Sequence, residues 1–165
     1  MREFDHSLSI EAPAVRIIDA FFDAGDLEAW WHVSRSLCHP RPLGSYALEW
    51  PTTDWTDDVL GRMGGAFRGT VIDFKAGREF FVADAYWLPP DGEPIGPMAL
   101  EAGCTSLGER VVLRVRQSGW EKSPRWSRYY ELLASNLTRS LNELKTHLES
   151  RRTPINSQFP TPNSQ

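Results

Sequence analysis

The sequence has little cysteine, no excess of positive charge and no long apolar run, and each absence narrows what the chain can be. Two cysteines in 165 residues cannot form a disulfide framework, which favours a reducing cytoplasm. Eighteen basic against 22 acidic side chains give a net charge of −4, which is unfavourable for binding nucleic acid. No run of 18 apolar residues is present, so we expect no insertion into a membrane. Residues 1–6 are polar, and we expect no export signal.

The composition is typical of one globular domain followed by a polar tail. Hydrophobic residues make up 41% and charged residues 24%, and the length is sufficient to bury a sizeable core. Residues 151–165 are rich in Arg, Pro, Ser, Asn and Gln, and have too little apolar content to offset the entropy of ordering. We therefore predict a domain over residues 1–150 and a disordered tail over residues 151–165.

An apolar stripe in residues 124–149 organises the rest of the chain. Its members recur at steps of three and four, which places them on one face of an α-helix. They are Trp126, Tyr130, Leu133, Leu137, Leu141, Leu144 and Leu148. Ser123 fits the N-cap and Pro124 the first helical position. At about 1.5 Å per residue this helix is roughly 40 Å long, and its single apolar face needs a sheet to cover it.

The residues before this helix predict one strand, two helices and then several strands. The first strand covers residues 6–10, the first helix covers residues 13–23 and ends at Gly25, and Asp26 caps a second, shorter helix. Further alternating runs predict strands over residues 43–50, 66–74, 78–88, 97–106 and 109–119. Residues 51–65 fit no regular element. The prediction is an α+β fold in which a curved antiparallel sheet of about six or seven strands wraps around the long helix.

Five short motifs, in the right order, resemble the START-like or SRPBCC superfamily, whose architecture is the helix-grip fold. Within it the chain is most similar to the branch named after the activator of heat-shock protein 90 ATPase. The motifs are residues 10–13 with Val15, the paired tryptophans Trp30 and Trp31, the glycines of residues 64–73, residues 118–120, and residues 141–149. That branch commonly has a Gly-Trp pair where this chain has Asn136-Leu137, so the resemblance does not identify a ligand.

The resemblance implies a ligand cavity between the sheet and the long helix. Alternation along the strands places a set of side chains toward this space, although the same residues could simply fill a core. The expected lining is Tyr46, Leu48, Trp50, Ile72, Phe74, Trp87, Met98, Leu100, Leu113, Trp126, Tyr130 and Leu133. On the ambiguous strand 78–88 we assign Phe81, Ala83, Ala85 and Trp87 to the inner face. Because the stripe is aromatic at Trp126 and Tyr130, we expect the wide end of the cavity there, opposite Trp50 and residues 51–65.

Few residues suggest metal or catalytic chemistry. The spacing of His32, Cys38 and His39 lacks a second close pair of ligands, and the acidic residues 54–58 lack the glycine and the terminal glutamate of a calcium loop. We therefore expect no metal and no cofactor. An enzyme would need buried polar groups that move a proton, but most of the available candidates fall on the outer face by alternation. These candidates are Glu49, Asp84, Tyr86, Glu101 and Arg114.

Three functions remain open. The first is a cytoplasmic binding domain for a small apolar or aromatic molecule. The second is a cyclase or hydrolase that uses the same cavity, although no nucleophile–base pair can be named. The third is a chaperone-associated protein-interaction module that uses the exposed face of the sheet. A homodimer is compatible with each of the three.

Overall fold

The computed structural model describes residues 2–150, and the predicted tail at residues 151–165 lies outside this range. Three helices are described: α1 (Ala14–Asp19), α2 (Ala24–Trp31) and α3 (Pro124–Ser150). The strands of the main sheet are β1 (Phe4–Ile10), β2 (Arg35–Cys38), β3 (Ser45–Trp50), β6 (Gly65–Lys75), β7 (Glu79–Leu88), β8 (Ile95–Leu107) and β9 (Arg110–Ser118). A separate two-stranded sheet consists of β4 (Thr56–Asp57) and β5 (Gly61–Arg62).

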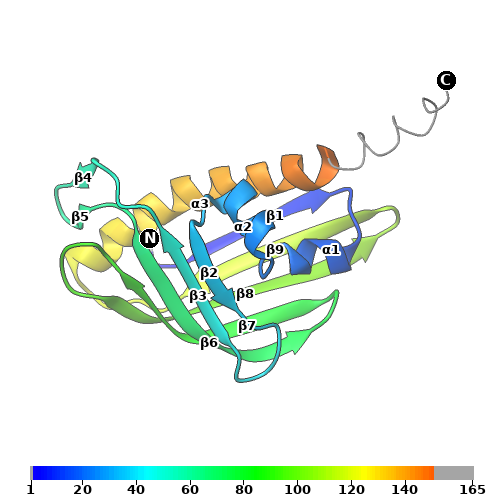
Figure 1. Cartoon of the computed structure of the whole chain (residues 1–165), viewed down its shortest axis with the longest axis horizontal. Helices are drawn as coiled ribbons and strands as arrows, with labels where there is room; N and C mark the ends of the chain where they lie inside the picture. The colour runs from blue at the N-terminus through cyan, green and yellow to red at the C-terminus, as the bar shows by residue number, and fades with distance from the viewer. Residues whose placement is uncertain (1, 151–165) are drawn as a thin grey trace.

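The main sheet is antiparallel, and its strand order is β1-β9-β8-β7-β6-β3-β2. The first strand therefore pairs with the last one. From β2 to β9, each strand of the main sheet pairs with the main-sheet strand that follows it along the chain. Figure 1 shows α3 lying lengthwise across this sheet, with the β4–β5 hairpin beside its first turns and α1 and α2 near its far half. The predicted α+β architecture, a seven-stranded sheet against a long C-terminal helix, is confirmed.

The long helix begins and packs as its sequence predicts. The Ser123 hydroxyl accepts a hydrogen bond from the backbone N–H of Trp126 at 3.2 Å, which caps the first turn. Of the stripe, six side chains are buried and Leu133 is half-buried. The six buried ones are Trp126, Tyr130, Leu137, Leu141, Leu144 and Leu148.

The two short helices divide differently from the prediction. The first helix ends near Asp19, and Asp23 caps the second: its carboxylate accepts the backbone N–H of Asp26 at 2.9 Å. Gly25 therefore lies inside the first turn of α2, where an acidic cap outweighs the low helix propensity of glycine. Because Asp26 does not serve as the cap, its buried carboxylate is available to Arg16 and His147.

A β-bulge in β6 reverses the predicted facing of Ile72. The pairing register with β7 shifts between Val71 and Asp73, so Val71 is buried and the side chain of Ile72 is 47% exposed. Strict alternation from residue 66 cannot anticipate such an inserted residue. Phe74 does turn inward, and its ring lies 5.3 Å from that of Phe22.

A second irregularity lies in β7 at Asp84, whose φ is 51°. The register with β8 shifts between Val82 and Ala85. The inner face of this strand therefore carries Phe80, Val82, Ala85 and Trp87. Phe81 and Ala83, which we assigned to the inner face, are only half-buried. The prediction was right beyond the bulge and wrong before it, because one extra residue moves every preceding side chain to the other face.

Residues 35–38, 56–57 and 61–62 form strands that the sequence did not predict. β2 is four residues long and lies at an edge of the sheet, and β4 and β5 have two residues each, so none is long enough to show a period. Leu43 was predicted to begin a strand, but its φ is 66° and its side chain is exposed. β3 therefore starts at Ser45.

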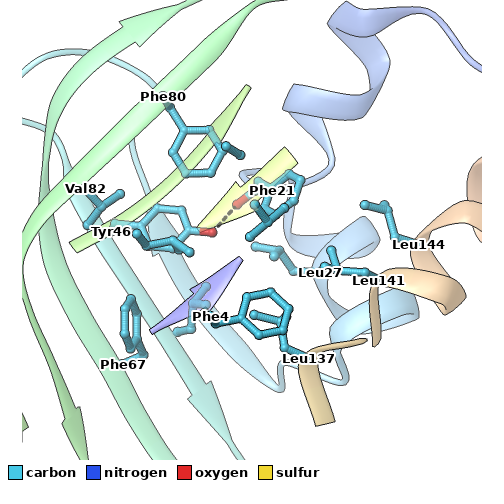
Figure 2. Packing of buried hydrophobic residues seen from close by; sticks show 14 of the residues in the cluster. Phe4, Phe21, Leu27, Tyr46, Phe67, Phe80, Val82, Leu137, Leu141 and Leu144 are labelled. Carbon is cyan, nitrogen blue, oxygen red and sulfur yellow. Dashed lines mark hydrogen bonds between the residues drawn. The ribbon is translucent and has the colours of Figure 1, made fainter. Parts of the chain in front are cut away.

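An aromatic core fills the space beneath α1 and α2. The hydroxyl of Tyr46 donates a hydrogen bond of 2.8 Å to the backbone oxygen of Phe21, and the ring of Phe80 lies against both (Figure 2). Figure 2 also shows Leu141 and Leu144 of α3 approaching this cluster from the other side. Tyr46 is fully buried, and burial raises its pKa well above the usual tyrosine range. Aromatic side chains are therefore closely packed at this end of the molecule.

Candidate ligand cavity

A cavity of about 730 Å³ lies at the other end, beneath the middle of α3. It is bounded by the end of α2, by β3, β6, β7 and β9, and by residues 51–64, which contain the β4–β5 hairpin. The apolar lining consists of Trp31, Trp50, Pro51, Trp55, Leu60, Met63, Phe67, Trp87, Tyr129, Leu132, Leu133 and Leu137. The polar side chains are those of His32, Thr53, Gln117, Asn136, Arg139 and Ser140. Four of the seven tryptophans in the sequence therefore face one space.

The tryptophans of the wall are held in place by hydrogen bonds to the backbone. Trp50 Nε1 donates to the oxygen of Trp31 at 2.8 Å, and Trp87 Nε1 donates to the oxygen of Gly64 at 2.9 Å. The ring of Trp31 also stacks on that of Trp30, with centroids 4.7 Å apart. Because the two indole N–H groups are satisfied, Trp50 and Trp87 offer apolar ring surface to the cavity rather than unpaired donors.

Asp57 fastens residues 51–64 over the cavity. One carboxylate oxygen accepts the backbone N–H groups of Val59 and Leu60, each at 3.0 Å, and the other accepts Arg128 of α3 at 2.8 Å and 2.9 Å. The hydrogen bonds from Arg128 hold the pKa of the Asp57 carboxyl below its usual range. The hairpin is thereby joined to the helix that forms the opposite wall.

Two polar side chains meet at the inner end of the cavity. Gln117 is 2% exposed, and its amide nitrogen donates to the hydroxyl of Tyr129 at 2.6 Å and lies 3.4 Å from the sulfur of Met98. Burial raises the pKa of Tyr129 far above its usual value, so the hydroxyl keeps its proton. The ring of Tyr129 lies 5.6 Å from that of Trp87, which connects this polar pair to the tryptophan wall.

Charged groups lie at the outer end. His32 Nε2 is 3.0 Å from a carboxylate oxygen of Glu143, and both side chains are exposed. Arg139 donates to the side-chain oxygen of Asn136 at 3.0 Å. Trp55, half exposed at 50%, borders the opening from the hairpin side. The cavity therefore runs from a charged opening to an apolar interior that ends in Gln117 and Tyr129.

The structure brings three of the twelve predicted lining residues to the cavity: Trp50, Trp87 and Leu133. Tyr46, Leu48, Met98, Leu100 and Leu113 face inward but belong to the packed core, and Phe74 packs at the same end. Ile72 is on the outer face. Trp126 and Tyr130 are also buried in the core, and Tyr130 donates a hydrogen bond to the oxygen of Gly119 at 2.7 Å. The wide end of the cavity is therefore further along α3 than we expected.

Sequence reasoning missed Phe67, Gln117, Tyr129 and Leu132, among other lining residues. Tyr129 and Leu132 each precede a stripe residue by one, so they lie on the flank of the helix face. Gln117 had a readable signal: it continues the alternation of Val111, Leu113 and Val115, and is thus a polar residue in an inward position.

The candidates for catalysis lie away from the cavity. Glu49 pairs with Arg35 and Glu101 with Arg116, while Arg114 binds Asp5 with two hydrogen bonds. Asp84 and Tyr86 are exposed on β7. Among residues 2–150, no three His, Cys, Asp or Glu side chains are arranged to hold a metal ion. None of the described lining residues is a carboxylate.

A curved antiparallel sheet around a long C-terminal helix, hollow at one end, defines the helix-grip class of proteins. No family model matches the sequence, and no curated protein matches it. Solved structures do match. A protein from Mesorhizobium loti is 16% identical, with a TM-score of 0.68 over 90% of this chain and 98% of its own.

Two further structures have informative names. The Aha1 dimer from Colwellia psychrerythraea is 16% identical, with a TM-score of 0.62 over 90% of this chain and 97% of its own. DynU16, a protein of the dynemicin biosynthetic locus, is 16% identical, with a TM-score of 0.60 over 90% of this chain but 48% of its own. These likenesses establish the helix-grip fold. No helix in residues 2–150 is long and apolar enough to cross a membrane.

Proposed function

We propose that this chain is a cytoplasmic helix-grip protein that binds a small apolar or aromatic molecule in the cavity beneath α3. The observation that carries the proposal is the cavity of about 730 Å³ with four tryptophans in its wall. Ligand pockets of proteins typically measure about 300–1,000 Å³ and are mostly apolar with a few polar groups. The flat indole faces favour a flat, aromatic ligand over a branched aliphatic one.

The cavity is preformed, which supports binding. The hydrogen bonds of Trp50 and Trp87 to the backbone fix two walls, and the Asp57–Arg128 ion pair fixes the hairpin above them. A ligand then needs to order few side chains on entry, and this lowers the entropic cost of binding. Cys38 and Cys104 are free and half-buried, and burial raises the pKa of each thiol to about 11, which suits a reducing compartment.

The proposal is tested with N-phenyl-1-naphthylamine, an uncharged probe that fluoresces in apolar surroundings. The probe is excited directly and titrated with the wild-type protein and with Leu133→Trp, which adds bulk inside the cavity. We expect micromolar binding to the wild type and at least a tenfold loss in the variant, because the added indole occupies the space that the probe needs.

A matched control is Ile72→Trp, which adds the same indole on the exposed outer face. We expect this variant to bind the probe as the wild type does, and circular dichroism checks that both variants are folded. Failure of the wild type to bind, or equal losses in the two variants, would refute the proposal.

The enzyme alternative has weaker support. Of the described lining residues, His32 has the side chain best suited to proton transfer near neutral pH, and it sits exposed at the opening beside Glu143. DynU16 comes from a biosynthetic locus, which keeps a cyclase-like role as a second hypothesis. Turnover of a bound aromatic compound that is lost in His32→Ala would favour this alternative.

The interaction alternative rests on the likeness to the Aha1 dimer. The exposed large hydrophobic side chains of the described residues lie on several elements; they include Val15, Leu37, Ile72, Tyr86 and Leu107. Membership of the branch named after the ATPase activator, and a homodimer, both remain proposals. Light scattering after size-exclusion chromatography decides whether the chain is monomeric or dimeric.

A further inference from the structure

We propose that Gln117 and Tyr129 select ligands that carry a hydroxyl group on an aromatic ring, of the phenol or naphthol kind. This inference rests on the proposed function and adds the chemistry that the cavity recognises. It starts from a feature that a purely apolar site does not need: a glutamine with 2% exposure at the inner end of a tryptophan-lined space.

The hydrogen-bond inventory of the pair leaves one acceptor and one donor for a ligand. The amide nitrogen of Gln117 donates to Tyr129 and lies against Met98, so both of its hydrogens are used. The amide oxygen of Gln117 accepts no hydrogen bond from residues 2–150. In the described range, two side-chain polar atoms are shielded from solvent and have no hydrogen-bond partner: Arg116 Nε and Trp120 Nε1. The Gln117 oxygen is not one of them, so it is not shielded from solvent. This oxygen therefore faces the cavity that Gln117 lines.

The Tyr129 hydroxyl supplies the donor. Its oxygen accepts from Gln117, and its own hydrogen has no acceptor among the described residues. Burial keeps this hydroxyl protonated across the working pH range. The inner end of the cavity thus offers an oxygen that accepts and, beside it, an O–H that donates.

A ligand hydroxyl satisfies both groups at once, because it donates its hydrogen to Gln117 and accepts from Tyr129. An ether or ketone accepts only, and leaves the Gln117 oxygen desolvated without a partner. An ionised carboxylate brings a second set of acceptors toward the Gln117 oxygen, and the cationic side chain of the lining, Arg139, lies at the outer end of the cavity, away from this pair. A hydrocarbon satisfies neither group. The aromatic ring follows from the tryptophan wall.

The test compares four naphthalenes of similar shape: 2-naphthol, 2-methylnaphthalene, 2-methoxynaphthalene and 2-naphthoate. Each displaces N-phenyl-1-naphthylamine from the wild-type protein at pH 7, where 2-naphthol is uncharged. We expect 2-naphthol to bind about tenfold to a hundredfold more tightly than 2-methylnaphthalene, with the ether between them, because an unpaired buried polar group opposes binding by this much. Tighter binding of 2-naphthoate than of 2-naphthol would overturn the inference.

Two variants test whether Gln117 and Tyr129 bind the ligand hydroxyl. Tyr129→Phe and Gln117→Met should each reduce the 2-naphthol preference to less than about threefold, while 2-methylnaphthalene binds as well as before or better. A merely structural role would weaken both ligands equally and leave the preference intact, and this result would overturn the inference. Tyr86→Phe removes a hydroxyl from the outer face and should change nothing.

The outcomes separate this inference from the proposed function. If all four naphthalenes bind with similar affinity, the cavity binds aromatic compounds but does not read a hydroxyl, and only the present inference fails. If none of them binds and the probe does not bind either, the proposed function fails with it. Should Gln117→Met not fold, the conservative Tyr129→Phe gives the answer alone.

Discussion

The buried carboxylate of Asp26 should contribute about 2 kcal/mol to the stability of the protein, and this contribution should disappear in acid. Arg16 donates to both carboxylate oxygens, at 2.6 Å and 2.7 Å, and His147 of α3 lies 2.9 Å from one of them. Burial by itself opposes the charged form, yet these partners lower the pKa of Asp26 to about 2 from an ordinary value of 3.8. The group joins α1, α2 and α3.

The magnitude follows from the shift in pKa. Each unit corresponds to about 1.36 kcal/mol, so a fall from 3.8 to about 2 stabilises the folded state by roughly 2 kcal/mol. Because the folded pKa is depressed, this stabilisation is fully present above the unfolded pKa. It is lost as the pH falls from about 4 through 2, because below the folded pKa both states bind the proton. Asp26 is 3% exposed, so solvent screening reduces the figure little.

The assay is urea unfolding of the wild type and of Asp26→Asn at several pH values between 7 and 2.5. We expect the variant to be less stable by about 2 kcal/mol at pH 7, and the difference between the two free energies of unfolding to shrink below pH 4 and to be less than half of that value at pH 2.5. Asp58→Asn removes an exposed carboxylate and serves as the control. A difference that stays constant down to pH 2.5, or none at pH 7, would show that the ion pair does not act as described.

Two further changes probe the core and the covering hairpin. Leu144→Ala should destabilise the protein by about 2–5 kcal/mol in urea unfolding, because Leu144 is fully buried. The control, Val15→Ala on the surface, should change the free energy of unfolding by less than about 0.5 kcal/mol. Equal effects of the two substitutions would contradict the packing of α3. Asp57→Asn should speed proteolytic cleavage within residues 51–64 and weaken probe binding severalfold, since it removes the ion pair to α3, and Asp58→Asn should do neither. The wild type should lose the same protection as the pH falls below the ordinary carboxyl range, because the pKa of Asp57 is lowered in the folded state.

The sequence predicted the fold well because a long helix repeats its signal. The stripe from Trp126 to Leu148 contains seven side chains in register, and no single irregularity can disguise it. The strands are shorter, and one inserted residue puts the side chains on its two sides out of a single alternation, so an assignment that fits one side fails on the other. The bulges beside Ile72 and Asp84 had this effect, and their positions depend on how neighbouring strands pair rather than on local composition.

The cavity was harder to predict than the fold, because it forms where inward-facing side chains do not pack against side chains from the opposite wall. Tyr46 and Trp50 both lie on β3, yet the first is enclosed by Phe21 and Phe80 while the second borders open space. The difference arises from α1 and α2, which fill one end of the curved sheet and leave the other to residues 51–64. No periodicity in the sequence encodes that difference. A polar residue in an inward position, as at Gln117, is the pattern that could have located the site.

The β4–β5 hairpin has its own small sheet, separate from the seven-stranded one. Its sequence can therefore diverge, lengthen or be exchanged without breaking a hydrogen bond of the main ladder, provided that the aspartate–arginine link to α3 and the turn at Gly64 are kept. Gly64 must remain a glycine, because its φ is 117° and a side chain there would come within 2.5 Å of the Pro51 oxygen. The main sheet and α3 thus form a scaffold, and the β4–β5 hairpin is a separate segment that covers the cavity. New ligand preferences can be engineered by replacing this hairpin while the helix and the main sheet are left unchanged.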